Sequence, residues 1–304
     1  MERDNNAVVI VTADDFGLSP GVDRGILDGF RRGVVTSTAL LVNFPDFSES
    51  LSRLREEPGL EVGIHLNLTA GPSVLPRKRV RTLVGRDGSF QSFSQFFARV
   101  AISQIDWSEV IAEWRAQFER GIEHGCRFTF ITSHQHVHML PEGARICAKL
   151  AHEFGVRSVR LTNFRLREML WPLRPKGVAL APFVPTVRDI LQSSGLHCNA
   201  STLEIPPGNP DSGLRGVCGM VQRLDAGVHE LVCHPAYEDA QLAERDPYVA
   251  GRQNELTVLE DPRLRAYLES AGVKRATFEE MPGPVKRKDK AFGQVAALHK
   301  LPLH

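Results

Sequence analysis

Short apolar runs alternate with amphipathic stretches along most of the chain. Runs typical of buried strands occupy residues 7–13, 37–43, 61–68, 127–133, 156–162 and 228–233, with weaker ones at 201–206 and 274–278. Apolar side chains at helical spacing predict helices over 21–33, 47–54, 107–124, 142–154 and 261–271. Because strands that alternate with helices form βαβ units, the pattern predicts an α/β fold with a mainly parallel sheet.

Three segments depart from this alternation. Residues 71–106 combine prolines, a basic stretch and several phenylalanines, and predict an insertion made of a loop and a short amphipathic helix. Residues 206–219 are rich in proline and glycine and predict a loop. Residues 282–304 show little periodicity, which predicts a solvated C-terminal extension or a peripheral subunit contact. No change of composition marks a second domain, so we expect one domain over 1–281.

Composition narrows the classes of protein. The chain has 304 residues, 42% of them hydrophobic and 24% charged, which is ordinary for a folded globular protein. Its formal net charge of +1 argues against nucleic acid or an anionic membrane as partner. No run is long enough to span a bilayer, and no signal peptide is evident. The five cysteines are widely spaced without a CxxC, so we expect free thiols and a cytoplasmic protein.

Acids and histidines gather where the predicted strands end. They are Asp14 and Asp15 after the first strand, His65 at the exit of the third, His134, His136 and His138 after 127–133, and His234 after 228–233. The carboxyl ends of parallel strands meet on one face of a barrel or sheet, and that face carries the active site. We therefore expect these side chains to form one site.

The acid pair is predicted to share two tasks. Ser19 and Pro20 are a good pair to begin the next helix, so Asp14 and Asp15 are not needed as helix caps. Neighbouring side chains of a strand point to opposite sides, and a bend permitted by Gly17 is needed to bring both acids to one site. One acid can then bind a cation while the other takes a proton from bound water.

The histidines allow structural and functional interpretations. His65 by itself is more typical of a hydrogen-bonded core histidine. In an extended segment His134, His136 and His138 share one side, either as a solvent-facing cluster or as one metal ligand with two supporting or substrate-contacting neighbours. Two imidazoles and a carboxylate leave positions open for water and substrate, as in catalytic zinc sites, and other divalent ions suit similar sites. His234 is either a packed histidine at a strand end or a general acid.

Several motifs carry a specific resemblance. They are Thr12-Ala13-Asp14-Asp15-Phe16-Gly17, Val35-Thr36-Ser37-Thr38 running to Val42-Asn43, Gly63-Ile64-His65-Leu66-Asn67-Leu68-Thr69, Ser133-His134-Gln135-His136-Val137-His138 and Cys233-His234-Pro235-Ala236. In order and spacing they resemble the YdjC/ChbG-like carbohydrate deacetylase family, which includes chitooligosaccharide deacetylases and hopanoid-associated deacetylases. HExxH, GxGxxG after a strand and GxxxxGK[ST] are absent, which disfavours nucleotide chemistry.

The resemblance implies a distorted (β/α) TIM-like barrel, a single domain related to polysaccharide deacetylases, with one divalent metal ion, Mg²⁺ or Zn²⁺. It implies Asp15, His65 and His134 as ligands, Asp14 as general base and His234 as general acid. Family members often carry an acid where this chain has Thr132. Loss of that charge is expected to weaken metal binding or change its tuning.

The expected reaction is hydrolysis of the N-acetyl group of an amino sugar, free or lipid-linked. Candidate substrate contacts are Asn43, Asn67, His136, His138 and Arg160. Turn or capping roles for the asparagines and an ion pair for Arg160 are equally compatible with the sequence. The phenylalanines of 71–106 either cover a sugar ring or form a homodimer contact. The alternatives are another metal-dependent amidohydrolase, a phosphoesterase, or a non-catalytic sugar- or lipid-binding protein.

Overall fold

The computed structural model describes residues 6–164 and 179–281, and within them one curled sheet dominates the architecture. Its strands are β1 (Ala7–Phe16), β2 (Ser37–Leu40), β3 (Glu61–Leu66), β4 (Phe130–Ser133), β5 (Ser158–Val159), β6 (Ser201–Glu204), β7 (Gly227–Cys233) and β8 (Lys274–Ala276). Their order is β5-β4-β3-β2-β1-β7-β6, and β8 pairs with β1. All pairings between these strands are parallel, as the alternation predicted.

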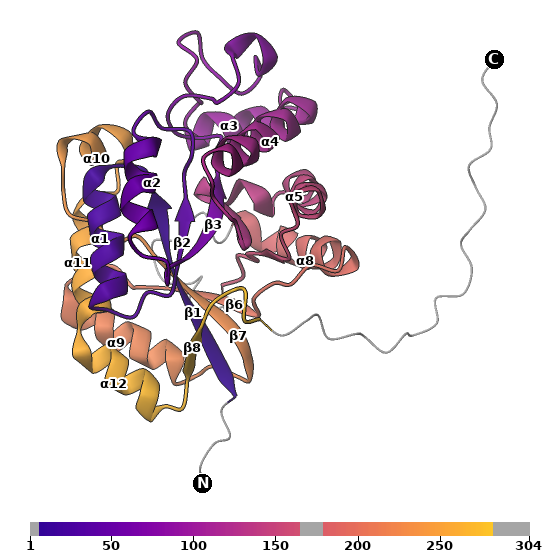
Figure 1. Cartoon of the computed structure of the whole chain (residues 1–304). Coiled ribbons are helices and arrows are strands. Elements are labelled where there is room, and N and C mark those ends of the chain that lie inside the picture. The colour runs from indigo at the N-terminus through magenta and orange to yellow at the C-terminus, as the bar shows by residue number, and fades with distance from the viewer. Residues whose placement is uncertain (1–5, 165–178, 282–304) are drawn as a thin grey trace, which may run out of the picture.

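Helices lie around the outside of the curled sheet (Figure 1). In the described residues they are α1 (Pro20–Arg31), α2 (Phe47–Arg55), α3 (Phe93–Ala101), α4 (Trp107–Glu123), α5 (Pro141–Phe154), α8 (Val184–Ser193), α9 (Pro210–Val221), α10 (Ala240–Arg245), α11 (Ala250–Glu260) and α12 (Pro262–Ser270). α1 begins as the sequence predicted, because Ser19 accepts the Val22 N–H and Pro20 needs no hydrogen bond there.

The barrel is distorted rather than regular. Single bridges join Ser158 to His197 and Phe164 to Thr202, so the β5 edge approaches the β6 edge with little regular pairing. β8 pairs only with residues 8–10 of β1, whereas β2 pairs with β1 further along, from Thr12. The short last strand thus separates β1 from β2 at the amino end of the sheet. The expected α/β fold, a single-domain distorted (β/α) barrel, is confirmed.

The amino end of the barrel is filled by the segment that follows β8. Phe278 is 1% exposed and stacks on Phe130 with ring centroids 4.1 Å apart, next to Ile10 of β1. The Glu61 carboxylate accepts the backbone N–H groups of Phe278 and Glu279, each at 2.7 Å. These contacts close the amino end of the barrel, so the carboxyl end is the one at which a site is expected.

The sequence did not predict helices α8, α10 and α11, and at one place its prediction is wrong. The loop expected over 206–219 is mostly helix α9, with the Asn209 side chain as N-cap and Pro210 in the first turn. The glycines that suggested a loop allow close packing instead: a Cβ on Gly216 would lie 2.4 Å from Pro206 Cγ, and one on Gly213 would lie 3.0 Å from Val258. Glycine here is required by tertiary contacts, which a local pattern does not reveal.

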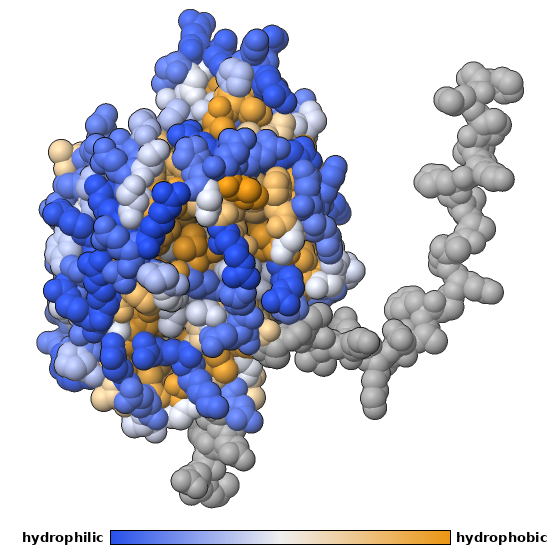
Figure 2. All heavy atoms as spheres, in the orientation of Figure 1, coloured by the Kyte–Doolittle hydropathy of each residue, from blue (hydrophilic) through white to orange (hydrophobic). Residues whose placement is uncertain are grey.

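The segment 71–106 leaves the barrel between β3 and α4 and projects beyond the carboxyl ends of the strands, at the top of Figure 1. It contains a 3-10 turn at Arg77–Arg79 and α3, close to the loop and short helix that were expected. Hydrophilic residues cover most of the face shown in Figure 2, with smaller hydrophobic areas between them. Among the described helices, none combines the length and apolar character needed to cross a membrane. The predicted extension 282–304 lies outside the described residues.

Candidate active site

The site begins where β1 ends in a bend. Asp15 has a positive φ of 74°, and the register between β1 and β2 shifts between Ala13 and Phe16. Gly17 has φ 89°, and a Cβ there would lie 2.6 Å from the Leu41 carbonyl oxygen. A left-handed aspartate is an uncommon conformation that is typical of functional sites. The bend that the acid pair needs is therefore made by Asp15 itself as well as by Gly17.

Asp14 is held by a buried arginine. Arg160 donates to both Asp14 oxygens, at 2.5 and 2.8 Å, and its other edge donates to the Glu230 carboxylate. All three side chains are 2% exposed or less. Burial raises the pKa of Asp14, but the Arg160 charge, with His65 nearby, outweighs it and lowers that pKa to about 2. Asp14 is thus ionised and oriented. The sequence allowed either a substrate contact or an ion pair for Arg160, and in the structure Arg160 forms ion pairs.

Asp15 is held by a second buried arginine. Arg252 Nη2 lies 2.7 Å from Asp15 Oδ2 and 3.0 Å from Asp246 Oδ2. Asp15 Oδ1 is buried and accepts no hydrogen bond from the described residues, although His65 Nε2 lies 3.3 Å away. Burial raises the pKa of Asp15, but the Arg252 charge outweighs it and holds that pKa well below its usual range.

Two histidines face the acids with their Nε2 atoms. His65 Nδ1 lies 2.5 Å from Thr132 Oγ1, and His134 Nδ1 lies 2.8 Å from Thr69 Oγ1. A hydroxyl that accepts the Nδ1 proton leaves the Nε2 lone pair free for a metal ion. Burial lowers the pKa of His65, against the effect of Asp14 and Asp15, which favours the neutral form that binds metals. Thr132, the departure from the family pattern, therefore orients a predicted ligand.

The other two histidines of the cluster point elsewhere. Residues His134–Met139 form a 3-10 turn in which Gln135 and His136 have positive φ, so the extended geometry expected for this segment is wrong. His138 is buried, with its ring nitrogens close to Ser133 Oγ and the Arg160 carbonyl oxygen. Burial lowers its pKa to about 3. His138 thus supports the fold around Arg160, whereas His136 is half-buried beside Thr162.

The two asparagines shape the loop after β3. The Asn67 side chain accepts the N–H groups of Thr69 and Ala70 and donates to the Ala70 carbonyl oxygen and to Asn43 Oδ1. Asn43 donates to the carbonyl oxygens of Ala70 and Pro72. Both are buried. This is the turn role that the sequence also allowed, and it places Thr69 against His134.

His234 lies at the rim of the site, with its side chain 28% exposed. Its backbone N–H donates to Glu255 Oε2 at 2.6 Å, and its Nδ1 lies 3.9 Å from the same oxygen. Tyr248 donates its hydroxyl to the other oxygen of Glu255, and its ring lies edge-on to the imidazole. A partly exposed imidazole beside a carboxylate suits proton donation to a group that leaves toward solvent.

The side chains fit a divalent ion. One donor atom each from Asp15, His134 and Asp246 lies within 4.8 Å of the other two, and all three residues are buried. His65 is not in this compact group but contacts Asp15. The unpaired Asp15 oxygen is the kind of atom that a cation would satisfy, and the mixed imidazole and carboxylate donors suit Zn²⁺ or Mg²⁺. The structure therefore brings two of the three predicted ligands together and adds an acid.

Sequence reasoning missed Asp246, Arg252, Glu230 and Glu255. Glu230 lies inside a predicted strand, where an acid in an apolar run was the available signal. Asp246 lies in the connection between α10 and α11, and Arg252 and Glu255 lie on α11. None of these last three follows a strand, so no periodic pattern pointed to them.

The sequence profile of the YdjC-like protein family matches residues 8–270. The chain belongs to this family. Carbohydrate deacetylases of Geobacillus stearothermophilus and Brevibacillus brevis are each 33% identical to it, over 89% and 90% of this chain and 96% and 99% of theirs. A structure described as a putative cellobiose-phosphate cleavage protein of Enterococcus faecalis superposes with a TM-score of 0.75 at 27% identity, covering 91% of this YdjC-like chain and 98% of its own.

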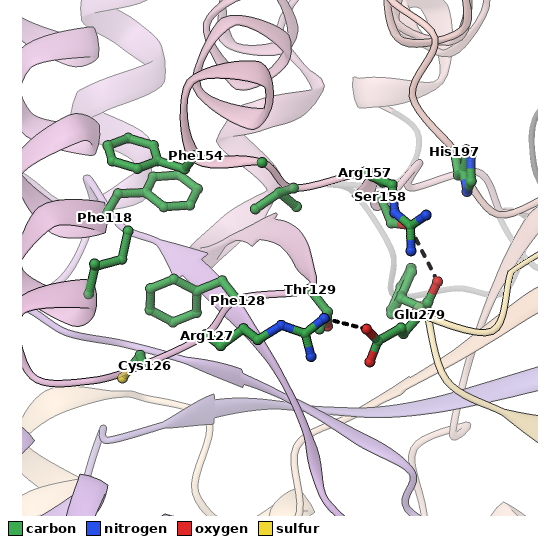
Figure 3. A pocket seen from close by; sticks show the side chains of 14 residues that line it. Phe118, Cys126, Arg127, Phe128, Thr129, Phe154, Arg157, Ser158, His197 and Glu279 are labelled. Atoms are coloured by element: carbon green, nitrogen blue, oxygen red, sulfur yellow. Dashed lines mark hydrogen bonds and ion pairs between the residues drawn. The ribbon is translucent and has the colours of Figure 1, made fainter.

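A separate pocket of about 290 Å³ lies at the other end of the strands (Figure 3). Phe118, Phe128 and Phe154 line one side, and Arg127 pairs with Glu279 on the other. Its lining includes Thr129, directly before β4, whereas His134 directly follows that strand. The pocket therefore contributes nothing to the candidate active site of this family member.

Proposed function

We propose that the protein is a metal-dependent hydrolase that removes the acetyl group from an N-acetylated amino sugar and releases acetate. The observation that carries the proposal is the unpaired, buried Asp15 oxygen, which lies 3.3 Å from His65 Nε2 and belongs to a residue grouped with His134 and Asp246. The names of the curated relatives support a carbohydrate substrate. The near-neutral net charge suits a neutral sugar, either small or lipid-linked.

Asp14 is the general base of the proposed reaction. It accepts a proton from the water whose oxygen attacks the acetyl carbonyl carbon. Arg160 keeps the carboxylate ionised and fixes both of its oxygens. Fixed orientation of the base avoids reorganisation when the proton moves. The low pKa of Asp14 makes it a weak base in isolation, so the attacking water has to be acidified.

Asp15, His65, His134 and Asp246 are the side chains available to hold the ion. A bound Mg²⁺ or Zn²⁺ supplies a Lewis acid that polarises the acetyl carbonyl and lowers the pKa of water. Thr132 and Thr69 hold the two imidazoles so that their Nε2 atoms face the acids.

His234 is the general acid. When the C–N bond breaks, the sugar nitrogen takes a proton from the imidazole and leaves as a free amine. Glu255 accepts the backbone N–H of His234 and lies 3.9 Å from its Nδ1, which holds this segment at the rim of the site. Acetate and the amino sugar are the products, and water supplies the oxygen atom that acetate gains.

The proposal is tested by measuring acetate released from N-acetylglucosamine oligomers and lipid-linked N-acetylated sugars. We expect a chelator to abolish release and added Mg²⁺ or Zn²⁺ to restore it. Asp14→Asn should lose about 100-fold or more in rate while still binding the ion, whereas Asp189→Asn, on the exposed face of α8, should match the parent protein. Undiminished release from metal-free protein would refute metal dependence, and hydrolysis of a phosphate ester or another amide alone would refute the substrate class.

A further inference from the structure

We infer that Asp246 is a metal ligand, a second carboxylate that this chain supplies from the connection between α10 and α11. The inference rests on the proposed function, because it concerns the same ion, but it adds a residue that no strand-end motif contains. It also assigns a task to Arg252, which lies between the two acids.

The Asp246 side chain is fixed with one oxygen turned to the site. Its Oδ1 accepts the Tyr248 N–H at 2.6 Å, and its own N–H donates to the Leu242 carbonyl oxygen at 3.0 Å. Its Oδ2 faces Arg252 Nη2 at 3.0 Å and His134 Nε2 at 4.0 Å. Asp246 is 7% exposed, so this oxygen is largely removed from solvent.

Asp15 meets the same Arg252 nitrogen from the other side and has one oxygen left over. Its Oδ2 meets the shared Nη2 atom at 2.7 Å, and its Oδ1 is left unpaired and buried. Asp15 thus uses one oxygen for the protein and keeps the other unpaired, whereas Asp246 Oδ2 also accepts a hydrogen bond from Arg252. One donor atom of each acid and an imidazole nitrogen of His134 still lie within 4.8 Å of one another. An unpaired buried oxygen that faces other donor atoms indicates a cation between them.

Charge favours the same conclusion. Asp14 and Glu230 share Arg160, and Asp15 and Asp246 share Arg252, so four buried carboxylates share two guanidinium groups. Buried charge is costly unless it is paired, and this excess is negative. A divalent cation near Asp15 and Asp246 would offset it, whereas a neutral sugar hydroxyl would not.

Arg252 keeps the two acids adjacent before the ion arrives. It is 1% exposed, donates from Nε to the Tyr248 carbonyl oxygen at 2.7 Å, and lies over the Tyr248 ring at 5.6 Å. Without the positive charge of Arg252, the carboxylates of Asp15 and Asp246 would repel each other. Arg252 is thus a positioning residue, and Asp246 is the ligand that it positions.

The experiment compares ion binding by the metal-free whole protein, by calorimetric titration with Zn²⁺ and by the visible absorption of added Co²⁺. We expect Asp246→Asn to weaken binding at least 10-fold and to change the Co²⁺ spectrum, because a charged donor is lost. Asp246→Glu should recover part of the affinity. The control variant is Asp211→Asn, which removes an exposed acid of α9 that pairs with Arg263 of α12. It should bind the ion as the parent protein does. Circular dichroism and the unfolding midpoint of each metal-free variant verify folding.

The outcomes separate this inference from the proposed function. If the parent protein binds the ion, Asp15→Asn loses it and Asp246→Asn has parental affinity, Asp246 is not a ligand and the metal-dependent function stands. Weaker binding by Asp246→Asn with an unchanged Co²⁺ spectrum also overturns the assignment, because it indicates an indirect role through Arg252. A parent protein that binds no divalent ion overturns both proposals.

Discussion

Arg160 and Arg252 each pair with buried carboxylates at two neighbouring places. Each is buried and each bridges two carboxylates, so that Asp14 and Asp15 stay ionised although solvent does not reach them. An aspartate buried without such a partner would have its pKa raised and would bind a proton instead of a cation. At the residue scale, the candidate chemistry therefore depends on two arginines that contribute no donor atom to an ion.

The pKa of Asp14 has a consequence for stability. A folded-state pKa of about 2, below the unfolded value near 4, means that ionised Asp14 stabilises the fold above pH 4 and that this contribution is lost as the pH falls toward 2. Asp14→Asn is expected to lower the free energy of unfolding by about 2 to 3 kcal/mol at pH 7. The difference from the parent protein should shrink below pH 4. Urea unfolding of both metal-free proteins between pH 7 and 3 measures it, and a difference that is constant over this range would contradict the assignment.

Thr132 offers a second test at this scale. Thr132→Val removes the hydroxyl next to His65 Nδ1, so the ring loses the partner that directs Nε2 toward Asp15. Loss of such a partner commonly weakens metal affinity 10- to 100-fold, and we expect a change of about that size. Thr132→Ser keeps the hydroxyl and should stay within a few-fold of the parent. Calorimetric titration with Zn²⁺ provides the measurement, and equal affinity of the Val and Ser variants would show that the hydroxyl does not matter.

At the scale of elements, the two ends of the barrel are built for different tasks. At the carboxyl end, the bend of β1, the 3-10 turn after β4 and the connection before α11 converge on the acids. At the amino end, the segment after β8 is tied to β3 through Glu61 and packs Phe278 into the barrel. Strand ends supply the side chains, and the loops that follow them decide where those side chains point.

Glu61 is predicted to stabilise the closed amino end. Its carboxylate accepts hydrogen bonds from Ser37 and Thr129 at 2.6 and 2.8 Å, besides the two backbone N–H groups of the last segment. Glu61→Gln places an amide N–H among these donors and should lower the free energy of unfolding by about 1 to 3 kcal/mol. Glu49→Gln, whose side chain is 74% exposed, is the matched control and should change it by less than about 0.5 kcal/mol. A Glu61 variant as stable as this control would refute the role.

At the scale of the whole molecule, the ion links segments that are distant in sequence. Asp15 lies near the end of the first strand, His134 follows the fourth, and Asp246 lies more than a hundred residues later. Their donor atoms approach only in the folded chain. Ion binding is therefore coupled to global folding and not to the order of one loop.

This coupling predicts stabilisation by the bound ion. An ion at 100 times its dissociation constant should stabilise the fold by about 2.7 kcal/mol, provided that the unfolded chain does not bind it. With an unfolding entropy of about 2.1 cal/mol/K per residue, a chain of 304 residues should then show a rise in melting temperature of about 4 °C. Differential scanning calorimetry with and without chelator measures the shift. Asp15→Asn should show almost no shift, and a shift that survives in that variant would place the ion elsewhere.

The sequence by itself determined the order of the strands, the parallel sheet, helices α1, α2, α4, α5 and α12, and the acids and histidines at the strand ends, which are Asp14, Asp15, His65, His134 and His234. These follow from local patterns, because strand periodicity, helix spacing and caps are short-range properties. Side-chain direction could not be predicted in the same way. The left-handed conformations of Asp15 and His136, and the turn that separates His134 from His138, arise from contacts between segments.

Only the tertiary structure decided which groups complete the site. Asp246, Arg252 and Glu255 lie outside every strand-end motif, and they meet the acids and His234 because α11 packs against α1 next to β1. The local pattern indicates a loop around Gly213 and Gly216, whereas close packing of α9 requires glycine at both positions. Local sequence carries propensity and period, whereas the pairing of buried charges is a property of distances that exist only after the chain has folded.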